Sequence, residues 1–332
     1  MSTRPRVVVT RRWPAAVERV LYEEFDTVLN EHDEPMSRAA LEAAMCSADA
    51  LCITVSDSMD AALLDIVDAK VRLLANFGVG FNHIDLAAAA RCGIVVTNTP
   101  GVLTECTADL AMTLLLMTAR RTGEGERELR EGGWTGWRPT HLVGTKVTGK
   151  TLGIVGAGRI GLALAHRAKF GFDMKILLAG RSGGAAPAKE FLHSLDAEYC
   201  ALEDLLKRSD FVSLHCPSSD QTHHLIDAAA FELMPQHAIL LNTARGDIVD
   251  EAALLAALQC GAIGGAGLDV YEAEPQVPEQ LQRLPNVVLL PHLGSSSQET
   301  RHAMGMCAVA NLRAFFAGET PPDIVQNSRQ EH

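Results

Sequence analysis

The sequence predicts an α/β protein made of two doubly wound parallel sheets, one in each of two domains. Three observations support this fold class. The chain has 332 residues, which corresponds to two domains of roughly 100–200 residues each. Strand-like runs alternate with helix-like runs in two separate blocks, a pattern typical of βαβ units. The second block opens with a glycine-rich turn of the kind that joins a strand to a helix.

The first block extends from residue 6 to about residue 99. Short runs rich in β-branched residues predict strands at 7–10, 51–55, 71–74 and 94–97. Segments rich in alanine and leucine predict helices between them, including 38–46 and 61–68. The breaker Thr99-Pro100-Gly101 ends this block.

A predicted helix at about 104–121 and a polar stretch rich in glycine and tryptophan, 131–139, lead to the second block. That block runs from 151 to about 291, with strands predicted at 151–155, 174–178 and 211–214 and a helix at 162–170. A last helix, roughly 297–316, follows it, and we expect this helix to pack back on the first block. The predicted first domain is therefore discontinuous, 1–100 plus 295–332, and the predicted second domain is 101–294.

The composition argues against several classes of function. Lys and Arg total 29 and Asp and Glu total 41, which gives a net charge of −12. Such a chain repels phosphate backbones and anionic membranes, so we expect neither a nucleic-acid partner nor a membrane partner. Hydrophobic residues make up 47% and charged residues 21%, as in ordinary globular proteins. An anionic ligand must then be attracted by local positive charge.

The beginning of the chain and its cysteines favour a reduced, cytoplasmic protein. No apolar segment of the signal-peptide type follows the basic start, and the longest apolar stretch, 110–119, is half the length of a membrane span. The eight cysteines are scattered without a CxxC pair, so they predict no disulfide framework and no zinc site. His223 and His224 would point to opposite sides of any regular element, and no metal site is expected there either.

The glycine-rich turn is Gly156-Ala157-Gly158-Arg159-Ile160-Gly161. An apolar strand precedes it and a helix rich in small residues follows it. The first glycine suits a tight turn, the second allows close approach of a pyrophosphate, and the third allows the helix to pack on the strand. Backbone N–H groups at the helix start would then face the anion. We interpret the turn as a dinucleotide site, the alternative being a plain strand–turn–helix corner.

The end of the next strand bears on the choice between NAD and NADP. An acidic residue here would bind the ribose 2′-hydroxyl of NAD, but this chain has Gly180-Arg181-Ser182. Arg181 and Ser182 are suited to a 2′-phosphate, and Gly180 leaves room for it. We therefore expect NADP(H) to be preferred, with NAD(H) possible. The alternative is that Arg181 is a solvated turn residue.

Four segments together resemble one known family. They are 76–85 (NFGVGFNHID), the glycine-rich turn, 234–246 (MPQHAILLNTARG) and 290–295 (LPHLGS). In this order and spacing they resemble the D-isomer-specific 2-hydroxyacid dehydrogenases over nearly the whole chain. Trp134-x-x-Trp137-x-Pro139 and Gly180-Arg181 are most similar to the glyoxylate/hydroxypyruvate reductases. The resemblance implies two Rossmann-like or flavodoxin-like domains with a cleft between them, and a homodimer. The substrate domain would be 1–100 plus 295–332, and the dinucleotide-binding domain would be 101–294.

The resemblance also implies which residues act on a 2-keto acid. Arg245 would bind the carboxylate or the adjacent carbonyl through two N–H groups. His292 would donate the proton, and Glu274 would orient the imidazole and favour its charged form. Glu272 is also available as a partner for His292, and spacing alone does not choose between the two glutamates. Val79 and Gly80 would bind the substrate through their backbone N–H groups.

Further cofactor contacts are implied in the same way. Besides the glycine turn and the 180–182 segment, these are Cys216, Pro217, Thr222, Thr243, Ala244, Arg245, Asp269, His292 and Gly294. Asp269 would accept a hydrogen bond from the nicotinamide carboxamide. The alternative is that Asp269 caps its own loop. Trp137 would either reach the partner subunit's site or fill the dimer interface.

The predicted function is an NADPH-preferring D-2-hydroxyacid dehydrogenase that reduces glyoxylate and hydroxypyruvate. Two alternatives within the enzymes are a reductase of bulkier 2-keto acids and an NAD-dependent dehydrogenase. An alternative of another class is a nicotinamide-sensing, corepressor-like binding protein without turnover. An intact arginine, glutamate and histidine set favours the enzyme.

Overall fold

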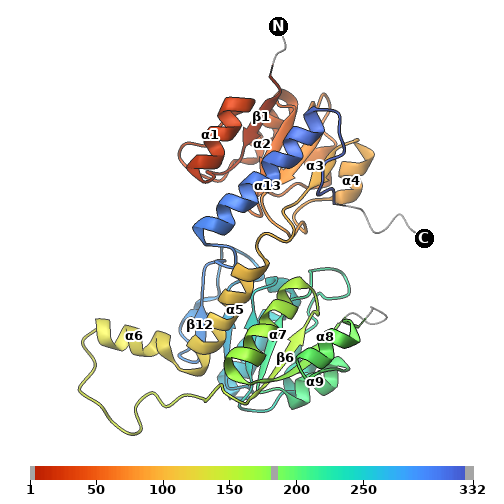
Figure 1. The fold of residues 1–332 in the computed structure, drawn as a ribbon. Helices are drawn as coiled ribbons and strands as arrows, with labels where there is room; N and C mark the ends of the chain where they lie inside the picture. The colour runs from red at the N-terminus through yellow and green to blue at the C-terminus, as the bar shows by residue number, and fades with distance from the viewer. Residues whose placement is uncertain (1–3, 181–185, 326–332) are drawn as a thin grey trace. The chain divides into compact units, whose positions relative to one another are not determined.

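The computed structural model describes residues 4–180 and 186–325. The chain divides into two compact units, one comprising Met1–Leu103 with Ser295–His332 and the other comprising Thr104–Gly294. Each unit holds one sheet whose strands all pair in parallel, with helices beside it (Figure 1). The predicted fold class, two α/β domains with parallel sheets, is confirmed.

The first unit contains a five-stranded sheet in the order β2-β1-β3-β4-β5, the flavodoxin-like order. Its strands are β1 (Arg6–Val9), β2 (Asp26–Val28), β3 (Ala50–Ile53), β4 (Leu73–Asn76) and β5 (Val95–Thr97). Its helices are α1 (Ala15–Glu24), α2 (Arg38–Ser47), α3 (Ala61–Leu64), α4 (Leu86–Arg91) and α13 (Gln298–Phe316). The last helix, α13, packs on α1 and β4 and lies beside α1 in Figure 1.

The second unit contains a seven-stranded sheet in the order β12-β11-β10-β9-β6-β7-β8. Its strands are β6 (Thr151–Val155), β7 (Lys175–Ala179), β8 (Ala197–Tyr199), β9 (Phe211–Leu214), β10 (Ile239–Asn242), β11 (Gly265–Leu268) and β12 (Val287–Leu289). Its helices are α5 (Thr104–Ala119), α6 (Thr122–Arg130), α7 (Arg159–Phe172), α8 (Lys189–Ser194), α9 (Leu202–Arg208), α10 (Ala228–Leu233), α11 (Glu251–Cys260) and α12 (Glu279–Gln282), with a 3₁₀ turn at Gly246–Ile248.

Both faces of the seven-stranded sheet are covered, so its central strands are mostly apolar. Neighbouring residues of one strand enter different cores: Ile154 packs with residues of α5 and α7, whereas Val155 packs with residues of α9, α10 and α11. Burial of one large aliphatic side chain stabilises the fold by roughly 1.5–3 kcal/mol. Continuous apolar runs are typical of parallel sheets covered on both faces.

The order of the seven strands determines where a ligand binds. β6 lies between β7 and β9, so the chain winds outward in both directions from this point. In open α/β sheets, ligands bind beyond the carboxyl ends of the strands at such a reversal. The loops that follow the strands on that edge of the sheet therefore position the site.

Helix α6 and the segment that follows it, residues 131–149, form an arm that extends from the side of the second unit (Figure 1). None of the α6 residues is buried. Several large apolar side chains of the arm are exposed, with relative exposures of 62% for Leu129, 53% for Trp134, 82% for Trp137 and 64% for Val143. Apolar groups gathered in this way mark an interaction surface.

The structure differs from the sequence predictions in a few elements. Strands β2, β8, β10, β11 and β12 were not predicted, and the helix predicted at 61–68 is only Ala61–Leu64. All eight cysteines are free thiols, and Cys260 at the end of α11 is the exposed one. No helix in the described part of the chain has the length and apolar character that a bilayer crossing demands.

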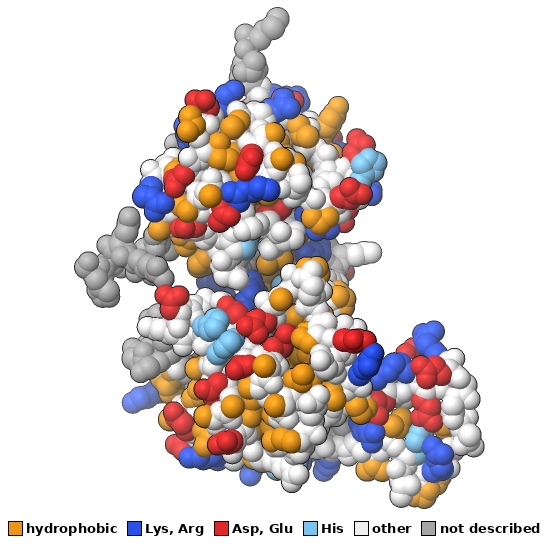
Figure 2. Space-filling model, turned by 180° about the vertical axis from the view of Figure 1, so that it is seen from behind, with side chains coloured by type: hydrophobic (Ala, Val, Ile, Leu, Met, Phe, Trp, Pro, Cys, Tyr) orange, Lys and Arg blue, Asp and Glu red, His pale blue; other side chains and the backbone are white. Residues whose placement is uncertain are grey.

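The acidic residues do not form one continuous patch on the face shown in Figure 2. Asp and Glu side chains alternate there with Lys and Arg side chains and with apolar ones. Many of the carboxylates form ion pairs with arginines, for example Glu24 with Arg313 and Asp33 with Arg11.

Candidate active site

Arg245, Glu274 and His292 follow three neighbouring strands of the seven-stranded sheet. β10, β11 and β12 lie side by side, with Leu241 beside Gly267 and Gly267 beside Val288. Arg245 comes three residues after β10, Glu274 six residues after β11 and His292 three residues after β12. Because parallel strands end at the same edge, the sheet brings together side chains that are up to 47 residues apart, from 245 to 292.

The turn that carries Arg245 is held by the side chain of Asn242. Its amide donates to the carbonyl of Arg245 at 2.8 Å and its carbonyl accepts from the N–H of Ala244 at 3.0 Å. The next residue, Gly246, lies so close to the Tyr271–Glu272 backbone that a Cβ would stand 1.9 Å from the carbonyl carbon of Tyr271. Only glycine allows this approach, which brings the Arg245 turn against the segment that carries Glu274.

Glu274 bonds His292, which settles the choice between the two glutamates left open by the sequence. The Nδ1 atom of His292 lies 2.8 Å from Oε2 of Glu274, and Oε1 of Glu274 accepts from the N–H of Tyr271 at 3.0 Å. Glu272 instead bonds His224. Among the described residues no protein group bonds Nε2 of His292, so this nitrogen is available to a ligand.

Asp269 holds the loop that carries His292. Both of its carboxylate oxygens accept backbone N–H groups, from Leu293 at 2.6 Å and from Gly294 at 2.8 Å, and its own carbonyl accepts from the N–H of His292 at 2.9 Å. His292 has φ +55°, which is unusual for a residue with a side chain. The loop-capping role, the alternative stated for Asp269, is what the geometry shows; its contact with a carboxamide stays a prediction.

Burial dominates the electrostatics of this group. It opposes ionisation of Glu274, yet the hydrogen bond from His292, the N–H of Tyr271 and the charge of Arg245 hold the pKa of Glu274 below its ordinary value. Burial lowers the pKa of Arg245, against the attraction of Glu274 and Asp247. Burial also raises the pKa of Asp269, although the two backbone hydrogen bonds oppose this shift. An anionic ligand would relieve the burial cost of the Arg245 charge.

The glycine-rich turn has the geometry that a pyrophosphate requires. Gly156 has φ +106°, and a Cβ there would lie 2.5 Å from the backbone nitrogen of Cys216. A Cβ on Gly161 would lie 2.3 Å from the carbonyl oxygen of Gly156, so this glycine lets α7 pack on the turn. Gly158 caps α7, and no atom lies within 4 Å of the position of its missing Cβ. The open space is in front of the helix start, where Arg159 and Ile160 begin α7.

The other predicted cofactor residues lie along the same edge of the sheet. Cys216 and Pro217 follow β9, and burial raises the pKa of the Cys216 thiol to about 11. The hydroxyl of Thr222 donates back to the carbonyl of Pro217 at 2.7 Å. Thr243 and Ala244 follow β10, and the buried hydroxyl of Thr243 has no hydrogen-bond partner among the described residues. An unpaired buried hydroxyl fits a site that a ligand completes.

Gly180 directly follows β7 and lies beside Tyr199, the last residue of β8. A Cβ on Gly180 would lie 2.4 Å from the hydroxyl oxygen of Tyr199, so a side chain at position 180 would require this hydroxyl to move. Arg181 and Ser182, the predicted contacts of a 2′-phosphate, lie outside the described residues.

Val79 and Gly80 belong to the first unit, in the loop after β4. Amide groups hold the carbonyls of this loop: Asn76 donates to Gly80 at 2.8 Å and Asn98 donates to Val79 at 2.8 Å. Within the described part of the chain, the N–H groups of Val79 and Gly80 donate to no protein acceptor. Two adjacent free N–H groups are suited to a carboxylate.

The prediction that His223 and His224 point to opposite sides was wrong. They lie in a turn, not in a regular element, and His224 has φ +50°. Their rings stack with centroids 3.9 Å apart. Sequence analysis also gave no role to Asn242 or Tyr271; an amide directly after an apolar strand is the signal that could have identified Asn242 as a turn-capping residue.

Comparison with known proteins supports one family. Residues 112–294 match the profile described as "D-isomer specific 2-hydroxyacid dehydrogenase, NAD binding domain". The chain is 44% identical over 326 residues to the glyoxylate reductase of Thermococcus litoralis, covering 97% of both chains. It is 45% identical over 324 residues to the glyoxylate reductase of Korarchaeum cryptofilum, covering 97% of this chain and 96% of that one.

Solved structures give the same result. An NADPH-dependent glyoxylate/hydroxypyruvate reductase from Sinorhizobium meliloti, in complex with NADP and malonate, has a TM-score of 0.85 and 37% identity, covering 97% of both chains. A protein from Thermus thermophilus has a TM-score of 0.87 and 42% identity, covering 97% of this chain and 100% of that one.

Proposed function

Because the chain belongs to the D-isomer specific 2-hydroxyacid dehydrogenase family and is an NAD(P)-dependent oxidoreductase, we propose that it reduces glyoxylate and hydroxypyruvate with NADPH. One observation carries the proposal. Arg245, Glu274 and His292 converge at the ends of three adjacent strands, with the imidazole anchored through Nδ1 and its Nε2 atom available.

Each residue has a defined part in the reaction. The planar guanidinium of Arg245 binds the carboxylate of the keto acid with two N–H groups. His292 donates a proton from Nε2 to the carbonyl oxygen as the alcohol forms. Glu274 stays ionised at neutral pH, keeps the proton-bearing Nε2 directed outward and stabilises the charged imidazole. A bound reduced nicotinamide supplies the hydride.

The residues that would hold the dinucleotide fit it. The space at Gly158 admits a pyrophosphate beside the N–H groups of Arg159 and Ile160. The unpaired hydroxyl of Thr243 lies close in sequence to Arg245, where a ribose or amide would satisfy it. The remaining proposed contacts are Gly156, Gly161, Cys216, Pro217, Thr222, Ala244, Asp269 and Gly294.

The preference for NADPH rests on the end of β7. Position 180 is glycine, with the Tyr199 hydroxyl beside it, so the chain has no carboxylate there for the ribose contact typical of NAD enzymes. Arg181 and Ser182 are then the proposed contacts of the 2′-phosphate. If so, Arg181→Ala raises the KM for NADPH at least about tenfold and leaves the KM for NADH unchanged. An equal effect on both cofactors would remove Arg181 from the proposal.

The substrate's carboxylate is also the proposed ligand of the Val79 and Gly80 N–H groups. Both groups have no other acceptor in the described part of the chain, and amides from Asn76 and Asn98 fix the loop. In this proposal, local hydrogen-bond donors offset the net charge of −12 where the anion binds.

The test follows oxidation of NADPH and NADH by the purified protein with glyoxylate, hydroxypyruvate, pyruvate and phenylpyruvate. We expect the highest kcat/KM with NADPH and the two small substrates. Higher kcat/KM with phenylpyruvate would favour a reductase of bulkier keto acids. Tight cofactor binding without turnover of any keto acid would refute the enzyme and favour a nicotinamide-sensing protein.

A further inference from the structure

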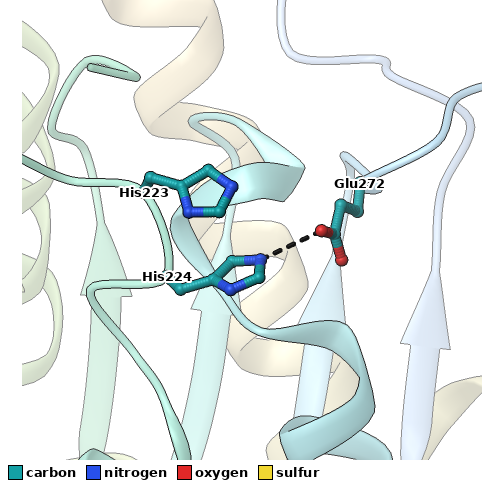
Figure 3. A group of neighbouring side chains, drawn as sticks. All are labelled: His223, His224 and Glu272. Atoms are coloured by element: carbon teal, nitrogen blue, oxygen red, sulfur yellow. Dashed lines mark hydrogen bonds and ion pairs between the residues drawn. The ribbon is translucent and has the colours of Figure 1, made fainter. Parts of the chain in front are cut away.

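Three metal-ligating side chains gather on the surface of the Thr104–Gly294 unit, and the proposed reaction uses none of them. His223 and His224 lie in the turn after β9, and Glu272 lies in the segment after β11 (Figure 3). One donor atom from each of the three lies within 4.8 Å of the other two. Among the described residues this is the one group of three His, Cys, Asp or Glu donors that comes so close together.

The backbone of the turn directs both imidazoles to one side. Consecutive residues of a strand point to opposite faces, but the positive φ of His224 turns its side chain under that of His223. The N–H of His224 donates to the carbonyl of Asp247 at 2.8 Å, which fixes the turn on the segment after β10. The two rings are therefore neighbours in a turn that a backbone hydrogen bond to Asp247 holds in place.

Glu272 is positioned independently of the histidines. Its N–H donates to Oε1 of Glu251 at 3.2 Å, and its backbone lies against Gly246. Its own Oε1 lies 2.9 Å from Nε2 of His224. The side chains of His224 and Glu272 are 33% and 36% exposed, so an ion can reach them from solution.

We propose that His223, His224 and Glu272 bind a divalent transition-metal ion of the Zn²⁺ type. Two imidazoles and one carboxylate are a set that Zn²⁺ accepts, with water as the fourth ligand, whereas Mg²⁺ and Ca²⁺ require oxygen ligands. Two ligands at about 2.1 Å from a tetrahedral ion stand roughly 3.4 Å apart. The His224–Glu272 pair needs little adjustment, and the exposed His223 ring rotates about its side-chain bonds to complete the set.

Such an ion would connect two segments that flank the proposed active site. One ends at His224, two residues after Thr222, and the other reaches Glu274 two residues after Glu272. The ion would take no part in proton or hydride transfer. It would tie the turn after β9 to the segment that carries Glu274.

The test is calorimetric titration of ZnCl₂ into the full chain after treatment with EDTA, with no cofactor or substrate present. Every protein carries Cys260→Ser, which removes the exposed thiol. Binding of one ion is expected, and His223→Ala, His224→Ala or Glu272→Gln should each weaken it about tenfold or more. MgCl₂ should not compete.

His237→Ala is the matched control. His237 is exposed and paired with one carboxylate, Asp210, at 2.8 Å, but has no second imidazole beside it. This variant should bind Zn²⁺ like the parent protein. The proposal is overturned if the parent binds no Zn²⁺ at submillimolar concentration, if the three variants bind as tightly as the parent, or if His237→Ala weakens binding as much as His224→Ala does. Because no cofactor is used, these outcomes are independent of the proposed reductase activity.

Discussion

Glu272 and Glu274 are two residues apart, yet each bonds a different histidine. Glu274 is 2.8 Å from His292, and Glu272 is 2.9 Å from His224. The pair therefore offers a matched comparison of the same chemical group in two environments. Only the glutamate that orients the proton donor should matter for turnover.

We expect Glu274→Gln to lower kcat by roughly 10²-fold or more, because a neutral amide neither stabilises the charged imidazole nor fixes its ring. Glu272→Gln is the control and should keep kcat within about twofold. Steady-state kinetics across pH measure both variants, and equal losses in the two would contradict the assignment of Glu274.

His292→Ala should lower kcat by about 10²–10⁴-fold, which is the usual contribution of a positioned proton donor. The dissociation constant for NADPH should change little, because the glycine-rich turn and the 180–182 segment are unaltered. Fluorescence titration of NADPH and single-turnover kinetics separate the two quantities. Near-normal turnover in this variant would exclude His292 as the proton donor.

His215 gives the protein a predictable weakness toward acid. Burial lowers the pKa of His215 to about 4, and its Nε2 lies 2.8 Å from the hydroxyl of Ser213. The unfolded chain takes up a proton near pH 6.5, whereas the folded protein does so only near pH 4. His215 therefore costs no stability above about pH 7, and its cost grows as the pH falls from about 6.5 to about 4.

Replacing this histidine should remove that cost. Between pH 8 and pH 5, we expect the free energy of unfolding to fall by about 2 kcal/mol more in the parent protein than in His215→Asn. Urea denaturation at the two pH values measures the difference. His302→Asn, which alters an exposed histidine, should retain the full pH dependence. Identical pH dependence in the parent and His215→Asn would show that His215 stays accessible to protons in the folded state.

At the scale of elements, the contact between the turn after β10 and the segment after β11 depends on one missing side chain. Gly246→Ala would place a Cβ 1.9 Å from a backbone carbon of Tyr271. We expect a loss of about 3 kcal/mol or more in stability, since backbone has to move. We also expect a lower kcat, because Arg245 and Glu274 separate.

Gly171→Ala is the control for that substitution. Gly171 lies in α7, and no atom lies within 4 Å of the position that a Cβ would take, so alanine should stabilise the helix by up to about 1 kcal/mol. Thermal unfolding monitored by circular dichroism reports both effects. Equal stability of the two variants would mean that the Gly246 turn yields more easily than its geometry implies.

The elements that sequence analysis predicted well are those with long apolar runs. Strand 151–155 and strand 211–214 occur as predicted, because both are mostly apolar and are buried on two faces. Among the strands that were not predicted, β2 and β8 have three residues each, with exposed or half-buried side chains, so neither shows a strand period. The helix predicted at 61–68 ends at Leu64, with Asp65 as its C-cap. It does not extend to residue 68, where Asp68 has a φ of +68°, outside the range of a right-handed helix.

The candidate site was predictable only in part for a related reason. Motifs and resemblance pointed to Arg245, Glu274 and His292, but their convergence depends on the order β10-β11-β12, which no local pattern determines. The side-by-side rings of His223 and His224 depend on the positive φ of His224. Two adjacent histidines in a sequence do not predict a positive φ. Local sequence propensity predicts helices and strands, whereas the order of the strands in the sheet determines which loops lie next to each other.

At the scale of the whole molecule, the arm predicts a homodimer. Trp134 and Trp137 stand on the arm with 53% and 82% exposure, which is costly in water for side chains of this size. We expect them to pack against a second copy of the chain. The double variant Trp134→Ser/Trp137→Ser should weaken the dimer by about 10²-fold or more, as loss of two aromatic anchors does.

Light scattering after size-exclusion chromatography over a range of concentrations measures this effect. Tyr22→Ser is a suitable control, since Tyr22 is 67% exposed but lies on α1, far from the arm in sequence. A monomeric parent protein, or a dimer unchanged by the arm substitutions, would contradict this prediction. The two tryptophans would then be expected to contact a different partner.

The eight reduced cysteines have a practical consequence for measurement. Seven are shielded to some degree, and Cys260 is the exposed one, at the end of α11. The chain enters β11 only five residues later, so this thiol lies toward the amino ends of the strands, the edge opposite Arg245 and His292. A maleimide dye or an electrode linker attached there would stand clear of the chemistry, and the native sequence already provides the attachment point.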